Sequence, residues 1–313
     1  MAGIEGAGAG GSEGASGSGK FMSEWNKNVK SREISEGRRM WAAFLRNRTA
    51  LAGGVIAILI VLVGIFAPWL APYDPLAQDS YIRLAESNAL HWLGTDDFGR
   101  DVLSRIIWGT RISLVIGVAS VLLGLIAGML MGMTAGYLRG KTEMVIMRFT
   151  DVIMCFPDLI LAIAVAAALG SNLINLILTI ALVMVPRFAR LSHGLILSLR
   201  ERDYVVAAQA IGARVPRILI RHIFPDIFGE LLVAGTLWIG VAVRLETNLA
   251  FIGLGVQPPT ATWGNMIREG VDVLINAPWI SVYAGLGILV TILSFNMLGD
   301  GVRDMVDPRL RGE

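Results

Sequence analysis

The segment Asp203–Pro225, with the sequence DYVVAAQAIGARVPRILIRHIFP, is a partly polar, basic island between two hydrophobic parts of the chain. Ala207 and Ala208 are adjacent, Gly212 follows four residues after the second, and Pro225 comes thirteen residues after that glycine. Small side chains permit close approach, glycine lets a chain turn out of a helix, and proline fits the first turn of the next one. This spacing fits a compact docking helix, and it also fits an ordinary amphipathic loop.

The composition of the whole chain indicates a membrane protein. Of its 313 residues, 54% are hydrophobic and 17% are charged, and the mean hydropathy is +0.63. A soluble domain carries roughly 25% charged residues, and uncharged runs of about 20 residues are long enough to cross a bilayer. The net charge of +2 does not favour a nucleic-acid partner, and the single cysteine, Cys155, cannot form an intrachain disulfide. We therefore expect an all-α integral membrane protein.

Six membrane crossings account for the apolar runs and for the charges between them. They are predicted at residues 50–70, at 112–137, in a hairpin from 149 to 188 that turns at 170–172, from near 231 past 246, and at 279–298. Lys and Arg are concentrated before the first crossing, between alternate crossings and after the last one. The long outer loops hold only Arg83, Arg100, Arg105, Arg111 and Arg268. This bias predicts that both termini are cytoplasmic.

The remaining segments divide the chain into four parts. Residues 1–24 are rich in Gly and Ser and are expected to be a disordered leader. Residues 25–48 are basic with interspersed aromatic residues, so they fit either an interfacial helix or a solvated linker. Residues 49–302 form the predicted six-helix domain, and residues 303–313 form a cytoplasmic tail.

Two further features point to packing and to buried charge. Gly124, Gly128, Gly132 and Gly136 recur every four residues in the second crossing, so they share one helical face. We expect this face to pack within the chain rather than to form a dimer. Asp158, Arg244 and Glu246 fall inside predicted crossings, where they either line a substrate path or pair with other charges. Arg244 and Glu246 are two residues apart and point to different sides of their helix.

Three segments together resemble the permeases of ABC importers. The island is similar to their cytoplasmic signature, EAA, three residues, G, nine residues, I-x-L-P, with Val206, His222 and Phe224 as departures. The loops HWLGTDDFGRDVLSR (residues 91–105) and FIGLGVQPPTATWG (residues 251–264) resemble those of the dipeptide, oligopeptide and nickel branch. The chain is thus similar to the C-type transmembrane subunit of that branch from residue 41 to residue 311.

The resemblance implies a bacterial inner-membrane permease with several partners. These are a B-type permease as heterodimer partner, two ATP-binding cassette subunits that hold ATP and Mg²⁺, and a periplasmic binding protein. The coupling helix, at about residues 203–213, would contact the ATPase. The implied coupling residues are Tyr204, Ala207, Ala208, Ala210, Gly212, Arg221 and Pro225. Peptides are the expected cargo, and nickel complexes, opines, glutathione and oligosaccharides are alternatives.

The chain itself is not expected to be an enzyme or to hold a cofactor. We find no phosphate loop, acidic metal cluster or nucleophile arrangement, and His91, His193 and His222 are far apart in the sequence. An ATP-independent secondary transporter is the less favoured alternative, because it would need a charge relay or a broken-helix site. A membrane enzyme would need catalytic residues clustered at one membrane depth.

Overall fold

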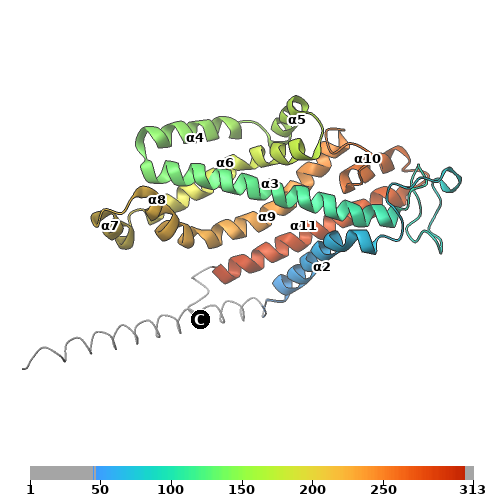
Figure 1. Ribbon diagram of the computed structural model, residues 1–313, viewed down its shortest axis with the longest axis horizontal. Coiled ribbons are helices and arrows are strands. Elements are labelled where there is room, and N and C mark those ends of the chain that lie inside the picture. The colour runs from blue at the N-terminus through green and yellow to red at the C-terminus, as the bar shows by residue number, and fades with distance from the viewer. Residues whose placement is uncertain (1–44, 46, 307–313) are drawn as a thin grey trace, which may run out of the picture.

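The computed structural model describes Leu45 and residues 47–306, and this part of the chain folds as helices joined by loops (Figure 1). The predicted leader and most of the predicted interfacial segment lie outside the described residues. The helices are α2 (Arg48–Leu70), η1 (Ser80–Ile82), α3 (Val102–Leu138), α4 (Gly140–Met154), α5 (Asp158–Leu169), α6 (Leu173–Leu199), α7 (Asp203–Ala210), α8 (Val215–Ile218), η2 (Leu219–Ile223), α9 (Phe224–Phe251), α10 (Trp263–Asp272) and α11 (Pro278–Val306).

Five continuous crossings are present among the described residues, and a bent pair of helices adds a sixth if it forms one span. The continuous ones are α2, α3, α6, the unit α8–η2–α9 and α11, each long and apolar enough to span a bilayer. The sixth is the pair α4 and α5, which are bent by 94° relative to each other. Pro157 lies at this bend as the residue before α5, where proline lacks the N–H that would continue a helix. The predicted all-α membrane fold is confirmed, and the first arm of the predicted hairpin consists of two helices, the first of which begins at Gly140 and not near residue 149.

Several helices extend beyond the predicted crossings. α3 begins at Val102 instead of Ile112, α6 continues past Phe188 to Leu199, and α11 includes residues 303–306 of the predicted tail. The hydropathy pattern marks where the apolar stretch ends, whereas a helix continues until a cap, a glycine or a proline stops it. Side chains at the starts act as such caps: Asp101, Asn172 and Thr262 accept backbone N–H bonds at α3, α6 and α10.

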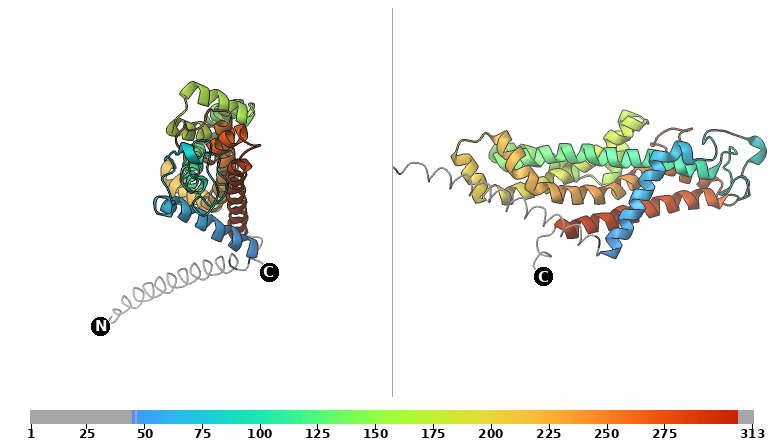
Figure 2. Two further views of the ribbon diagram at one scale, coloured as in Figure 1. Left: turned by 90° about the vertical axis from the view of Figure 1, so that its right-hand side faces the viewer. Right: turned by 60° about the horizontal axis from the view of Figure 1, so that its bottom comes forward.

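The helices form an elongated bundle with two distinct ends. α7 and α8 lie at one end, which we call the α7 end, and the loop of residues 72–101 lies with α10 at the other, the loop end (Figure 1). α4 runs along one side with α5 beside it, and α2 lies on the opposite side, as the left view of Figure 2 also shows. The bundle therefore has an α4–α5 side and an α2 side that meet different surroundings.

The predicted glycine face is the contact between α3 and α6. A Cβ atom at Gly128 would lie 2.5 Å from the Val185 carbonyl oxygen and 2.6 Å from the Phe188 Cβ, and at Gly124, Gly132 and Gly136 it would lie 3.0, 2.2 and 2.9 Å from the nearest atom of α6. Only glycine permits backbones to approach this closely. The prediction of packing within the chain is confirmed, and this contact fixes the centre of the bundle.

Candidate functional site

α7 presents one buried and one exposed surface. Val205 and Ala208 point into the bundle and are 0% and 4% exposed. They pack in a cluster with Met133 of α3, Ile196 of α6 and Ile227 of α9. This cluster therefore joins residues from three crossings to α7. Close-packed interiors transmit displacements with little compression.

Two side-chain hydrogen bonds hold α7 from either end. The Tyr204 hydroxyl donates to Asp226 Oδ2 at 2.6 Å, which joins α7 to the first turn of α9. Gln209 Nε2 donates to the Tyr137 hydroxyl at 3.0 Å, which joins α7 to the end of α3. Partial burial and the nearby Asp226 carboxylate raise the pKa of Tyr204 to about 12, so the phenol keeps its proton at physiological pH. The link between α7 and α9 is therefore insensitive to physiological changes in pH.

α7 ends at Gly212 in a Schellman motif. Gly212 has φ of +78°, its N–H donates to the Gln209 carbonyl at 2.9 Å, and the Ala213 N–H donates to the Ala208 carbonyl at 3.0 Å. This pair of bonds satisfies the carbonyls left free at the helix end. The helix of the expected coupling segment is Asp203–Ala210, three residues shorter than predicted, because the residues up to Ala213 belong to the cap.

The structure separates the predicted coupling residues into two sets. Tyr204, Ala207, Ala210, Gly212, Arg221 and Pro225 are exposed at the α7 end. Ala208 is buried against the bundle, so its small side chain serves the packing of this chain and not the approach of a partner. Pro225 lies in the first turn of α9, as its position predicts, although the π-helical turn η2 runs into that helix without a break.

Two exposed apolar residues at the α7 end were missed by the sequence interpretation. Val206 of α7 is 51% exposed, and Ile211, its C-cap residue, is 84% exposed. The small Ala207 and Ala210 between them are also exposed, as is Asp203 at the start of the helix. The sequence signal for Ile211 was a large apolar side chain directly before Gly212. The interpretation concentrated instead on the alanines of the signature.

The three charges predicted within crossings do not form one site. Asp158 accepts a hydrogen bond from Arg187 at 2.6 Å, as the pairing alternative requires. Arg244 is exposed, whereas Glu246 is fully buried, so the two point to different sides as predicted. The hydroxyls of Ser113, Thr247 and Thr262 lie beside Glu246, and no basic side chain of the described residues pairs with it.

A buried ion network fastens the loop end. Arg100 donates to Asp96 at 2.6 Å and to Glu269 at 2.8 Å, and Arg105 pairs with the same two carboxylates. Arg105 is 0% exposed. Glu269 belongs to α10 and Arg105 to α3. The network therefore joins the two segments, residues 91–105 and 251–264, whose sequences resemble loops of the permease branch. Nearby, His91 Nδ1 lies 3.0 Å from Asp101, the residue that caps α3.

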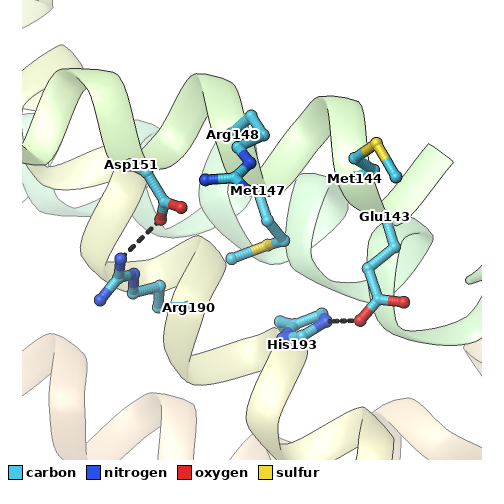
Figure 3. Close-up of a pocket in the computed structure, with 7 residues that line it drawn as sticks. All are labelled: Glu143, Met144, Met147, Arg148, Asp151, Arg190 and His193. Carbon is cyan, nitrogen blue, oxygen red and sulfur yellow. Dashed lines mark hydrogen bonds and ion pairs between the residues drawn. The ribbon is translucent and has the colours of Figure 1, made fainter. Parts of the chain in front are cut away.

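An open hollow of about 490 Å³ lies between α4 and α6 (Figure 3). Arg190 Nη2 lies 2.5 Å from Asp151 Oδ1 on one side of it, and His193 Nε2 lies 2.8 Å from Glu143 Oε1 on the other. The sequence interpretation did not single out these residues, because ion pairs between distant segments have no sequence signature.

Comparisons with known proteins agree with this geometry. The family described as "Binding-protein-dependent transport system inner membrane component" matches residues 124–312, and the "N-terminal TM domain of oligopeptide transport permease C" matches residues 35–88. The glutathione transport system permease protein GsiD of Pectobacterium atrosepticum is 41% identical over 275 residues, which cover 88% of this chain and 91% of that protein. GsiD of Shigella flexneri serotype 5b is 44% identical over 273 residues, 87% of this chain and 90% of that protein.

The family match begins inside α3 and includes the whole island with α7, and the second match covers α2. The broken crossing is a feature that a secondary transporter would also need, but the relatives are permeases of transport systems along nearly their whole length. The chain therefore belongs to the family of binding-protein-dependent transport system inner membrane components, as a C-type, multi-pass permease subunit of an ABC importer.

Proposed function

We propose that this subunit forms half of the pathway through which an ATP-driven importer moves peptide-like solutes into the cytoplasm. A B-type permease forms the other half, and two ATPase subunits bind ATP and Mg²⁺. The observation that carries the proposal is the position of α7, which is exposed on one side and packed into a core shared by three crossings on the other.

The α7 end is the side that faces the cytoplasm in this proposal. Arg200, Arg202, Arg214, Arg217 and Arg221 all lie around α7 and the segments that flank it. Such an excess of basic residues marks cytoplasmic segments, which places both termini inside as well. The loop end then faces the periplasm, where a binding protein delivers the solute.

The mechanical role of α7 follows from its attachments. When the ATPases close on ATP, they move α7, and the buried Val205 and Ala208 carry that movement to α3, α6 and α9. The hydrogen bond from Tyr204 to Asp226 pulls on the first turn of α9 in the same step. The permease pair then changes from inward-open to outward-open and accepts solute from the binding protein.

Glutathione is the first solute to test, because two of the relatives carry that name. Other peptides, nickel complexes, opines and oligosaccharides remain alternatives for this chain. Uptake of radiolabelled glutathione and of radiolabelled dialanine, in cells with and without this subunit, decides between glutathione and simple peptides.

A pair of exposed isoleucines provides a matched test of α7 docking. Ile211 is 84% exposed at the α7 end, and Ile275 is 98% exposed between α10 and α11 at the loop end. Neither side chain supports the fold of this chain, so glutamate is tolerated at both positions. We expect Ile211→Glu to lose the ATPase subunits on affinity purification of the assembled transporter, because a charge would be buried unpaired in the contact. Ile275→Glu should retain them. Retention of the ATPases by both variants would refute docking at α7.

A further inference from the structure

Three ion pairs connect α6 to the two halves of the broken crossing. They are Arg187 with Asp158 at 2.6 Å, Arg190 with Asp151 at 2.5 Å, and His193 with Glu143 at 2.8 Å. The three members on α6 are spaced three residues apart, so they lie along one face of that helix. We call these three pairs the charge ladder.

The charge ladder begins at membrane depth with Arg187 and continues along α6 toward the α7 end. α6 has 27 residues and is about 40 Å long at 1.5 Å per residue, and Arg187 is near its middle. Ionisable residues at this depth are costly in lipid, and they face a protein interior or a water-filled cavity. The opposite side of the bundle behaves differently: α2 is uncharged from Thr49 to Leu70, and it exposes Ile58 and Ile65 as a lipid-facing helix does.

The charge ladder is not sealed by the chain itself. The side chains of Arg187 and Asp158 are each 37% exposed, and those of Arg190 and Asp151 are 51% and 39% exposed. The open hollow lies beside the second and third pairs (Figure 3). Arg148 lines this hollow and forms no ion pair with any of the described residues. An exposed charged face at membrane depth must therefore border water or another subunit.

We propose that the charge ladder lines the water-filled solute path and contacts the solute, selecting solutes that carry both a positive and a negative group. Each pair offers one acidic and one basic partner, so an ammonium and a carboxylate of the solute exchange with a pair without leaving a charge uncompensated. A solute of one charge sign would always leave one member unpaired, and burying such a charge is costly. This inference rests on the proposed function, and it identifies the solute-contacting residues of that same pathway.

Thiol labelling tests whether the face borders water. In a Cys155→Ser background, which removes the only cysteine, Met147→Cys places a thiol in the hollow and Ile58→Cys places one on the α2 side. Thiolates form and react only where water reaches them. In the assembled transporter, we expect a membrane-impermeant methanethiosulfonate to modify the Met147→Cys variant on the order of tenfold faster than the Ile58→Cys variant. Equally slow reaction at both positions would overturn the proposal, since the hollow would then be covered by lipid or by a subunit.

A neutral pair tests contact with the solute. Arg190→Gln combined with Asp151→Asn removes both charges and keeps groups that hydrogen-bond each other. With radiolabelled glutathione, or dialanine if the wild type does not take up glutathione, we expect uptake to fall on the order of tenfold, as for loss of one charge-assisted bond. Assembly with the ATPases should be unchanged. Unchanged uptake would overturn the proposal, and so would equal losses of uptake and assembly, which would show a purely structural pair.

The proposal that α7 docks to an ATPase and the proposal that the charge ladder contacts the solute can each be refuted without the other. Thiol labelling requires no transport, so it reports on the charge ladder even if α7 does not bind an ATPase. Conversely, the comparison of Ile211→Glu with Ile275→Glu involves no residue of the charge ladder.

Discussion

Gly212 is the residue whose backbone conformation most restricts substitution on α7. Its φ of +78° suits glycine, and no atom lies within 4 Å of the position that a Cβ would occupy. A Gly212→Ala substitution therefore costs about 1–2 kcal/mol through the backbone alone. We expect α7 to open more often, which hydrogen exchange of the peptide covering residues 203–213 in the purified transporter would show as a gain of roughly fivefold or more in exchange rate.

Gly194 provides the matched control for this prediction. It also has open space around its Cβ position, but it lies inside α6 with helical backbone angles. Alanine favours a helix over glycine by about 0.5–1 kcal/mol, so Gly194→Ala should slow exchange in α6 or leave it unchanged. Equal exchange of α7 in the wild type and the Gly212→Ala variant would contradict the importance of the cap.

At the scale of single residues, the sequence predicts the required backbone conformation better than it predicts which side chains point into the bundle. Gly212 was predictable because only a turn explains a glycine at that spacing. Ala208 was not predictable as a buried residue, because α7 has eight residues, most of them small, and a helix so short has no clear apolar stripe. Asp158 was identified as a charge within a crossing, but its partner Arg187 lies 29 residues away in the chain.

The contact of α3 with α6 is the tightest contact between two elements, and its glycines are open to a direct test. Gly128→Ala places a methyl group 2.5 Å from the Val185 carbonyl oxygen and 2.8 Å from the Ala189 nitrogen. Backbone atoms cannot move aside as a flexible side chain does, so the helices must separate. Overpacking of this kind costs about 1–3 kcal/mol. We expect a lower midpoint of thermal unfolding for the detergent-purified transporter.

Gly235→Ala on α9 is the control for this contact. There a Cβ would meet its nearest neighbours, Leu125 and Val121, at 3.8 and 3.9 Å, which is ordinary contact distance. The midpoint should not fall. A decrease as large as that of Gly128→Ala would mean that glycines in these crossings are needed for another reason than close packing.

At the scale of elements, hydropathy and charge predicted the number of crossings but not their shapes. A four-residue glycine repeat has one physical explanation, so the packing face was predictable. The 94° bend before Asp158 was not, because many membrane helices contain proline without breaking, as α2 does at Pro68 and α6 at Pro186. Neighbouring helices decide whether a proline is accommodated or ends the helix.

The buried network around Arg105 joins parts of the whole molecule that are far apart in the sequence. Its guanidinium lies 2.7 Å from Glu269 Oε2, which is 164 residues further along the chain. Arg105→Met keeps much of the side-chain volume but leaves Glu269 with one basic partner fewer in a buried site. Removing one partner of a buried pair costs about 3–5 kcal/mol. We expect a marked loss of folded subunit after membrane extraction, measured as the monodisperse fraction on size exclusion.

Arg83→Met is the corresponding change at an exposed pair of the same loop. Arg83 and Asp97 lie 2.5 Å apart with side chains 55% and 38% exposed. Exposed pairs contribute about 0–1 kcal/mol, so the yield of folded subunit should stay near that of the wild type. If the two variants lost folded protein to the same extent, burial of the network would not explain its effect.

For the molecule as a whole, the sequence predicted which segments lie between the membrane crossings but could not assign a surrounding to each side of the bundle. α2 is uncharged from Thr49 to Leu70, whereas α4 carries Lys141, Glu143, Arg148 and Asp151, but only the fold shows that the two helices lie on opposite sides of the bundle. The solute path therefore became visible only when Arg187, Arg190 and His193 were seen aligned against the broken crossing.

The bend at Pro157 has a consequence for how the subunit is made. α5 has 12 residues, about 18 Å, which is too short to cross a hydrocarbon layer of about 30 Å, and its first amides receive no side-chain cap. Acyl chains offer these peptide groups nothing to bond with. A newly inserted subunit without its partner permease thus keeps unpaired backbone N–H groups at this bend inside the bilayer. We expect quality-control proteases to recognise such unassembled subunits until assembly covers the bend.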